Sequence, residues 1–314
     1  MSELKPFFSV VMPLYNKANY VKETIKTVLN QTFQDFEIVV IDDSSTDDSA
    51  KVVELIQDDR IRLVYQENAG VSAARNKGIQ ESRAEYIAFL DADDLWLPEF
   101  LQTIYELIQK YPDAGLYATS YKKRKANGKE SNINIQALPS NEYIGLIPNY
   151  FKSIVEGDLL VWTSATCIPK KIFKENDIWF PVGEKYGEDQ YMWARVAIQF
   201  DLAYDTKTCA IYQIEAENNT AGGVDQLKEP RSFIIDLKDD KNAKKDKMLN
   251  FWLNIYIQKE IRRVIRRNIK NGNKVLALVQ LSRYQLRFIY YLEIMLKLII
   301  PSFAANIATK YKNN

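Results

Sequence analysis

Three carboxylates directly follow one short apolar stretch of the chain. Asp91, Asp93 and Asp94 come after Tyr86–Leu90, which is long enough for one buried strand of a parallel sheet. Because burying unpaired carboxylates is costly, we expect them at the carboxyl end of that strand, where open α/β sheets bind ligands. Hard oxygen ligands this close together suit Mg²⁺ or Mn²⁺, whose shell substrate phosphates usually complete. The alternative is an acidic helix N-cap ahead of Leu95–Pro98.

Two other predicted strands also end in polar residues. Phe7–Met12 is rich in β-formers and stops at Pro13, which cannot donate in a strand ladder, and Phe36–Ile41 runs into Asp42–Ser45. The other elements expected here are a helix carrying Val21, Ile25, Val28 and Leu29, a helix carrying Val52, Val53 and Ile56, a strand at Ile61–Tyr65 and a helix at Ser72–Gln80. This alternation predicts a doubly wound parallel sheet with right-handed crossovers, and polar strand ends on one sheet edge indicate a binding site.

The middle of the chain is less regular. Glu188 and Asp189 open a predicted helix that runs to about Phe200, where they either favour the helix dipole or belong to a site. The other expectations are a helix from Pro98 to Lys110, a strand at Ala114–Tyr121, a solvated basic turn at Lys122–Lys129, irregular chain over 130–160, a strand at Val161–Ile168, a short helix at Pro169–Asn176 and a last strand at Cys209–Ile214.

Composition excludes several classes of chemistry. The 314-residue chain is 46% hydrophobic and 26% charged, which is typical of a folded soluble protein. It has no histidine, so His-based triads, His-ligated zinc and His general bases are excluded, and acid–base chemistry falls to carboxylates. No G-x-G-x-x-G and no G-x-x-x-x-G-K-[ST] occurs, which argues against a dinucleotide-binding dehydrogenase and against a P-loop enzyme.

Targeting signals and cysteines favour a cytoplasmic protein. The start MSELKPFFSV has no apolar core after a basic start, so no signal peptide is predicted. The longest apolar stretch, Phe288–Ile300, has 13 residues and includes Glu293 and Lys297, too short and too charged to span a bilayer. Cys167 and Cys209 have no pairing or metal-ligand spacing, so we expect buried thiols in a reducing compartment.

The net charge of +1 hides a strong asymmetry. Residues 228–314 hold 19 Lys/Arg against 7 Asp/Glu, while residues 1–227 are acidic. From Leu249 apolar residues recur at helical spacing among basic ones, and Val275–Ile300 is a second helical stretch. One interpretation is a basic helical extension packed on the body or on a homodimer partner. The other is peripheral contact of residues 249–300 with an anionic membrane surface. The acidic body and the absence of a nucleic-acid motif argue against nucleic acid.

Four stretches resemble the motifs of one enzyme family. The opening SVVMPLYNKANYVKETIKTVLNQTFQDFEIVVIDDSSTDDS is similar to the N-terminal signature of the family-two inverting glycosyltransferases of the GT-A fold. AGVSAARNKGI resembles their Ala-Arg-Asn-x-Gly stretch, YIAFLDADD their Asp-x-Asp strand and GEDQYMWAR their Glu-Asp acceptor-loop motif. The resemblance covers about residues 8–215 and implies an α/β fold of GT-A type: a doubly wound, mainly parallel sheet, here with a C-terminal helical extension.

The resemblance also implies a role for each matching residue. The enzyme would move a sugar from a nucleotide donor, most commonly a UDP-sugar, to a hydroxyl of a glycan or lipid-linked acceptor. Asp189 would be the general base, oriented by Glu188, and Asp93, with Asp91, would hold Mn²⁺ or Mg²⁺. The residues expected around the donor are Pro13, Tyr15, Glu23, Asp42, Asp43, Arg75, Asp91 and Trp162, although a buried core position is an equal expectation for Trp162.

One departure from the family pattern concerns the diphosphate. Family members often carry a His or Arg after the last strand of the body, but here the stretch reads YQIEAENNT. Lys207 or the basic tail would then supply the charge, or the metal site is looser than usual. The competing functions are a sugar-nucleotide-binding protein and a nucleotidyltransferase. The latter expects a Gly-rich, Lys/Arg-bearing loop after the first strand, and PLYNKAN is not one.

The expected organisation follows from these assignments. Residues 1–227 would form a GT-A catalytic domain, with a nucleotide-sugar half over about 1–121 and an acceptor half over about 122–227. Residues 228–314 would form the basic amphipathic extension. The resemblance implies a setting in bacterial surface-polysaccharide assembly, such as lipopolysaccharide or capsule, on the inner face of the cytoplasmic membrane.

Overall fold

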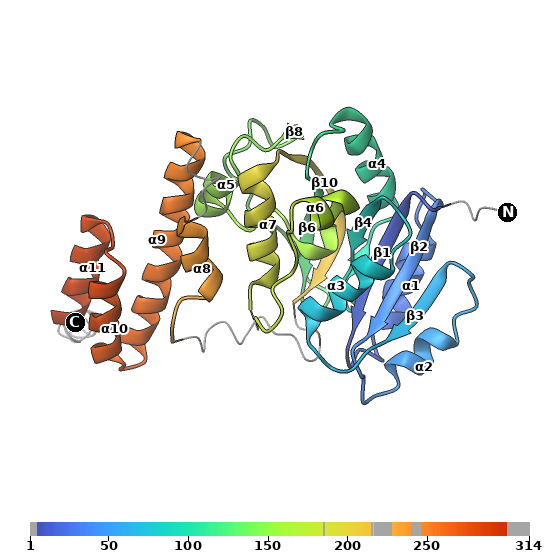
Figure 1. Ribbon diagram of the computed structural model, residues 1–314, viewed down its shortest axis with the longest axis horizontal. Coiled ribbons are helices and arrows are strands. Elements are labelled where there is room, and N and C mark those ends of the chain that lie inside the picture. Colours follow the sequence, from blue (N-terminus) through green and yellow to red (C-terminus); the bar gives the residue numbers. More distant parts are fainter. Residues whose placement is uncertain (1–4, 185, 215, 217–227, 240–245, 300–314) are drawn as a thin grey trace, which may run out of the picture.

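The computed structural model describes residues 5–184, 186–214, 216, 228–239 and 246–299 (Figure 1). Within them, one sheet has the strand order β3-β2-β1-β4-β9-β6-β10-β5, with β7 beside β6 and β8 beside β10. Helices cover both faces of this sheet. In Figure 1 the sheet lies to the right and the C-terminal helices α9, α10 and α11 to the left, with α5 and α7 between them.

The first four strands are parallel, as the sequence predicts. They are β1 (Phe8–Leu14), β2 (Phe36–Asp42), β3 (Ile61–Tyr65) and β4 (Tyr86–Phe89). The helices α1 (Val21–Leu29), α2 (Ser49–Glu54) and α3 (Val71–Glu81) connect them. The carboxyl ends of β1, β2 and β4 therefore meet at one edge of the sheet, and Pro13, Asp42, Asp43, Asp91 and Asp93 lie at these strand ends.

Pro13 lies inside β1 rather than ending it. Val11 accepts a hydrogen bond from Leu90 on the β4 side, and Pro13, two residues on, faces the same side. The pairing of β1 with β4 stops at Val11 and Phe89, so no ladder partner waits there for the amide that proline lacks. On the other side the pairing with β2 continues to Leu14 and Asp42.

The second half departs further from the predicted pattern. β6 (Leu116–Arg124) includes Lys122–Arg124, which pair with β7 (Glu130–Asn132), so the predicted solvated basic turn is a β-hairpin instead. The stretch predicted as irregular holds β7, β8 (Ile144–Leu146) and α5 (Tyr150–Glu156). Short elements of this kind take their order from pairing with β6 and β10 and carry little periodicity of their own.

Two predicted strands have different bounds. The stretch Val161–Ile168 contains the 3₁₀ turn η1 (Thr163–Ala165), and strand β9 (Thr166–Pro169) runs antiparallel between β4 and β6. The last strand, β10 (Leu202–Gln213), starts well before Cys209 and pairs in parallel with β6 through irregular register near Asp205 and Thr208. The remaining elements of the body are β5 (Leu95–Trp96) and the helices α4 (Phe100–Lys110), α6 (Lys170–Glu175) and α7 (Glu188–Gln199).

Alternating strand residues divide the core between two faces. From β1, Val10 and Met12 pack with α1 and α4 on one face, whereas Val11 packs on the face that α3, α6 and α7 cover. The hydrophobic cluster on the face of Val11 continues through α5 into the C-terminal helices, where Leu253 and Ile257 are buried. The Cys167 and Cys209 thiols are buried and unpaired, as predicted.

Within residues 228–239 and 246–299 the C-terminal chain is mostly helical. Its elements are α8 (Ser232–Asp236), the 3₁₀ turn η3 (Leu237–Asp239), α9 (Lys247–Lys270), α10 (Lys274–Arg283) and α11 (Phe288–Ile299). The predicted second helical stretch is thus two helices, α10 and α11. Helix α9 packs on α5 of the body, and α10 and α11 pack on α9. The predicted domain boundary at residue 227 lies outside the described residues. Across the described chain, we find no helix with the length and apolar character needed to cross a bilayer.

The packing of α3 on β1 gives a first test. A Cβ built on Gly78 would lie 2.4 Å from Val11 Cγ1, although alanine in a helix is ordinarily the more stable choice by about 0.5–1 kcal/mol. We expect Gly78→Ala to lower the free energy of unfolding by about 1–3 kcal/mol, measured by urea denaturation, because the core is overpacked. Gln80→Ala, at an exposed position of α3, is the control. A more stable Gly78→Ala protein would contradict this close approach.

Candidate active site

Asp94 is a structural anchor within the carboxylate cluster. It is 1% exposed; its Oδ2 accepts hydrogen bonds from Trp162 Nε1 at 3.0 Å and Ser164 Oγ at 2.6 Å, and its Oδ1 from the Gln213 amide at 3.1 Å. Burial, with the neighbouring carboxylates adding to it, raises the pKa of Asp94 well above its usual range. With its acceptor sites occupied by the protein, Asp94 ties the end of β4 to η1 and β10 and leaves Asp91 and Asp93 for ligands.

Arg75 joins the strand-end carboxylates to α7. Its guanidinium is 3% exposed and donates to Asp91 Oδ1 at 2.7 Å and to Glu188 Oε1 at 2.9 Å. Its ring contact is with Phe180, 5.3 Å from the guanidinium carbon to the ring centre. Burial acts against the charged guanidinium, but the carboxylates of Asp91 and Glu188 outweigh it and raise the pKa of Arg75. The predicted residues Arg75, Asp91 and Glu188 therefore form one cluster, with Asp189 next to it in the chain.

The Asp189 carboxyl group has a raised pKa. Burial, and next the Glu188 carboxylate, raise the pKa of Asp189 to about 6, while Arg75 acts in the opposite direction. Its Oδ1 accepts from the Gln190 amide at 2.7 Å, and Thr163 Oγ1 lies 3.4 Å from its Oδ2. The side chain is partly exposed, so a ligand can reach it. A carboxylate with such a pKa is ionised at neutral pH yet more basic than an ordinary Asp.

Asp93 is paired with a lysine that the sequence analysis did not single out. Lys17 Nζ lies 2.6 Å from Asp93 Oδ2, and the two side chains are only 13% and 15% exposed. Burial raises the pKa of Asp93, the Lys17 ammonium acts against this, and the Asp91 carboxylate adds to it. Asp91 and Asp93 each already have a cationic partner in the protein, Arg75 and Lys17, and a divalent cation would have to share these carboxylates with them.

The fit to a metal depends on the substrate. Mg²⁺ and Mn²⁺ in phosphate-transfer sites are usually held by one or two carboxylates together with substrate phosphates. Asp91 and Asp93 supply that number, and no cluster of three or more His, Cys, Asp or Glu suited to a metal occurs in the described part of the chain.

Asp42, the last residue of β2, and Asp43, which follows it, differ in their hydrogen bonding. Asp43 accepts from the amides of Ala69 and Gly70 at 2.8 and 2.9 Å and from Gln66 Nε2 at 2.7 Å, so it shapes the turn into α3. Gly70 begins this helix at φ +86°, a conformation that favours glycine. Asp42 is 3% exposed, and its Oδ1 has no hydrogen-bond partner among the described residues.

The loop after β1 is fixed to the loop after β2. Asn16, at φ +52°, accepts with Oδ1 from the Thr46 amide at 2.7 Å, and the Lys17 amide donates to Ser49 Oγ at 2.7 Å. This holds Lys17 at the site. Pro13 lies half-buried near the end of the same strand, and Tyr15, just beyond the strand, is 45% exposed.

The other predicted residues have mixed surroundings. Trp162 is partly buried between Tyr121 and Tyr212, with ring centres 5.5 and 4.1 Å away, and is oriented by Asp94. Glu23 is exposed in the first turn of α1. Lys207, expected as a source of charge for the diphosphate, pairs with Glu99 at 2.6 Å instead. Gln213 donates to the Asp93 carbonyl, so the last strand approaches the metal-type carboxylates with an amide.

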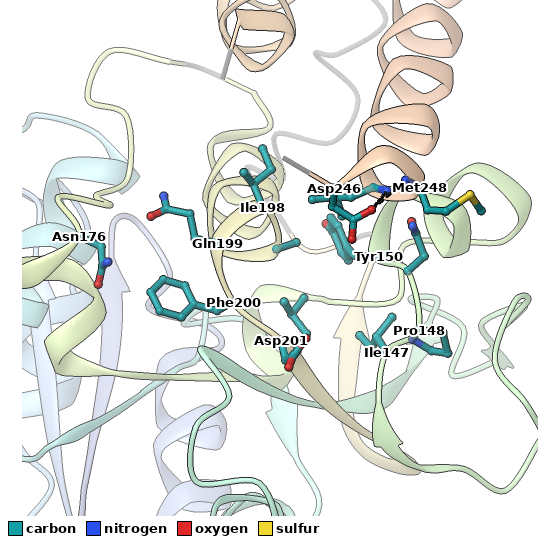
Figure 2. Close-up of a pocket in the computed structure, with 14 residues that line it drawn as sticks. Ile147, Pro148, Tyr150, Asn176, Ile198, Gln199, Phe200, Asp201, Asp246 and Met248 are labelled. Carbon is teal, nitrogen blue, oxygen red and sulfur yellow. Dashed lines mark hydrogen bonds between the residues drawn. The ribbon is translucent and has the colours of Figure 1, made fainter. Parts of the chain in front are cut away.

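A separate cavity lies at the opposite end of α7 (Figure 2). It measures about 620 Å³ and is lined by residues of the α5 start, the α7 end and the α9 start, among them Tyr150, Gln199 and Asp246. None of the predicted site residues lines it. Asp189 stands in the first turn of α7 and Gln199 in its last, so the 12-residue helix separates the cavity from the site by roughly 15 Å at 1.5 Å per residue.

Comparison with known proteins assigns this fold to a class. The described fold is that of a GT-A glycosyltransferase: *Staphylococcus aureus* TarS 1–349, whose structure was solved in complex with UDP-GlcNAc, matches with a TM-score of 0.63 over 85% of this chain and 80% of that one, at 20% identity. The sequence profile of glycosyl transferase family 2 matches residues 9–173. The chain belongs to glycosyl transferase family 2.

Curated relatives are similar over part of their length. The glycosyltransferase GlyG of *Streptococcus pneumoniae* is 33% identical over 202 residues, which cover 61% of this chain and 64% of that protein. The putative teichuronic acid biosynthesis glycosyltransferase TuaG of *Bacillus subtilis* is 33% identical over 48% of this chain and 60% of its own. An uncharacterized glycosyltransferase of *Rickettsia bellii* is 32% identical over 68% of this chain, and the match spans 29% of that protein.

Proposed function

We propose that this glycosyltransferase moves a sugar from a UDP-sugar to a hydroxyl of a glycan or lipid-linked acceptor, with inversion at the anomeric carbon. The observation that carries the proposal is the chain of contacts from Asp91 through Arg75 to Glu188, with Asp189 next to it at a pKa of about 6. It connects the expected diphosphate site with a carboxylate suited to deprotonating an acceptor. The UDP-GlcNAc complex of TarS supports a UDP-sugar donor, whose sugar would be a hexose or an N-acetylhexosamine.

In the proposed reaction the acceptor oxygen attacks the anomeric carbon on the face opposite the diphosphate. The bond from that carbon to the β-phosphate oxygen breaks, its electron pair stays on the nucleoside diphosphate, and the acceptor proton passes to Asp189. Because a carboxylate is far less basic than an alkoxide, proton transfer accompanies attack. Glu188, held by Arg75, orients the start of α7.

The remaining residues would bind and orient the donor. Asp42, whose Oδ1 has no hydrogen-bond partner among the described residues, would accept a hydrogen bond from the base or the ribose, and Pro13 and Tyr15 would lie beside the donor. Asp43 supports the turn before Arg75. Asp93 and Asp91 would hold Mn²⁺ or Mg²⁺, which when bound stabilises the charge that develops on the leaving diphosphate. Lys17 would add positive charge there. Glu23 and Trp162 stay donor-side predictions, with Trp162 also able to face the acceptor.

A setting in surface-polysaccharide assembly would follow from the relatives. TuaG carries the name of a teichuronic acid enzyme, and we infer an acceptor of the same kind, a growing glycan or its lipid-linked form. Lipopolysaccharide and capsule are acceptors of the same class. Work on the inner face of the cytoplasmic membrane would place such an acceptor beside the enzyme.

Removal of Asp93 tests the metal. We expect Asp93→Ala to abolish UDP release from the active sugar nucleotide and to lose Mn²⁺ binding in the presence of UDP, measured by calorimetry, because the ion loses its main protein ligand. EDTA should silence the wild type, and Mn²⁺ or Mg²⁺ should restore it. Asp113→Ala, at an exposed position distant from the strand ends, is the matched control. Full activity in EDTA would refute the metal-assisted mechanism.

Asp189→Asn tests the general base. The amide keeps the shape without the basicity, so kcat should fall ~10²–10⁴-fold while the Kd for UDP stays unchanged. In the wild type, kcat should rise with pH through an apparent pKa near 6 and then level off, because the base works only when ionised. Turnover in Asp189→Asn above about a tenth of the wild-type value would assign the proton to another group.

The outer face of the C-terminal helices suits a membrane surface. On α11, Phe288, Ile289, Leu292 and Leu296 form one exposed apolar strip, between 45% and 75% exposed. Exposed Arg283 and Arg287 precede it. A basic, apolar helix face complements an anionic leaflet, where each Lys or Arg is worth roughly 1 kcal/mol. We propose peripheral contact through this strip, which would hold the acidic body near a lipid-linked acceptor.

Vesicle flotation tests the membrane contact. The full-length protein should float with phosphatidylglycerol vesicles at low salt, and the double variant Phe288→Asp/Ile289→Asp should remain below. Leu55→Asp, at an equally exposed apolar position far from α11, is the control and should float. Failure of the wild type to float, or equal flotation of the double variant, would reject the contact. A dimer in sedimentation that the double variant loses would assign the strip to a second copy instead.

A further inference from the structure

The start of α7 is held on two opposite sides. Glu188 contacts Arg75 on the side of the sheet, as described above. Gln190, two residues on, is contacted from the C-terminal extension: Arg231 Nη2 donates to Gln190 Oε1 at 3.0 Å, and Tyr256 OH lies 3.4 Å from the same oxygen. Asp189 stands between these two anchored residues.

Arg231 is itself firmly placed. Its side chain is 7% exposed, and Nη2 also donates to Glu260 Oε2 at 2.8 Å. Its guanidinium carbon lies 4.7 Å from the centre of the Phe233 ring. Tyr256 and Glu260 are four residues apart, hence on one face of α9, so a single face of this helix presents both groups.

Gly187 makes room for this contact. It precedes α7 at φ +78°, and a Cβ built on it would lie 2.0 Å from Arg231 Nη1. The guanidinium thus lies directly against the backbone that begins the helix. A residue with a side chain would be strained at this φ and would also displace Arg231.

We propose that Arg231 is a positioning residue for glycosyl transfer: it fixes the first turn of α7, and with it Asp189, to the C-terminal helices. This rests on the proposed role of Asp189 as the base. The extension is then part of the catalytic apparatus, and its contact with Gln190 sets where the base lies relative to the acceptor hydroxyl.

The charges around Asp189 make the proposal measurable. Arg231 is one of the groups that lower the pKa of Asp189, against burial and Glu188, which raise it. The charged and titratable groups that face it are Glu188 on α7, Arg75 on α3, Tyr121 on β6, Tyr150 on α5, and Arg231 and Tyr256 of the extension. Removing the Arg231 charge should therefore raise the pKa of Asp189.

The experiment compares the buried Arg231 with Arg262, a partly buried arginine of the extension. Arg262 pairs with Glu293 and lies 4.7 Å from the Tyr290 ring, the same kind of contact as that of Arg231, but it joins α9 to α11 away from α7. We expect Arg231→Gln to lower kcat ~10–10²-fold with the donor KM within two-fold, because the base is misplaced and the donor site is not. Its acidic limb in the pH profile of kcat should move to higher pH. Arg262→Gln should keep the wild-type values of both.

Two further measurements separate a positioning role from a structural one. Arg231→Lys keeps the charge, so its acidic limb should return to the wild-type pH while kcat recovers only in part. Amide hydrogen exchange over residues 188–191 should speed up in Arg231→Gln and not in Arg262→Gln. An unmoved acidic limb in Arg231→Gln, or equal behaviour of the two Gln variants, would overturn the proposal. Retained turnover in Asp189→Asn would refute the base instead, whereas the exchange comparison decides the Arg231 contact independently of that assignment.

Discussion

The buried guanidinium of Arg75 is the interaction on which the site depends. It bridges Asp91, at the end of a strand in the first half of the fold, and Glu188, at the start of a helix in the second half. A charge with 3% exposure is tolerated only when it is paired, and breaking such a pair typically costs about 3–5 kcal/mol. Removing one partner would therefore destabilise the contact between the end of β4 and the start of α7, because it would leave a buried charge unpaired.

Burial and the neighbouring Glu188 make the ionised form of Asp189 energetically unfavourable. Asp189 has a pKa of about 6 in the folded protein against 3.8 for an ordinary Asp. Its contribution to stability is therefore complete below about pH 4 and is lost as pH rises through 6, because the unfolded chain releases that proton more easily. At neutral pH the Asp189 carboxylate is mainly ionised, but its charge is less favourable in the folded protein than in the unfolded chain. That is the state in which Asp189 most readily accepts a proton.

How much of this could be predicted depends on the range of the signal. The strands through Phe89 and Asp42 and the helix at Glu188 follow from local apolar patterns, and the resemblance to the family adds the proposed roles of Asp93 and Asp189. The Lys17–Asp93 pair joins residues 76 positions apart and arises because the loop after β1 is tied to that after β2. The hydrogen bonds that Asp94 accepts likewise come from η1 and β10, which are distant in the sequence, so its structural role could not be predicted. No local pattern carries such contacts.

The C-terminal helices show the same limit from another side. Their apolar spacing predicts helices, and their charge predicts a surface partner, yet neither pattern indicates that α9 also faces inward toward α7. The face of α9 with Tyr256 and Glu260 contacts Gln190 and Arg231, whereas the exposed apolar strip lies on α11. Because α11 packs on α9, and α9 contacts both Arg231 and Gln190, a continuous series of side-chain contacts joins the outer helices to the residue next to Asp189.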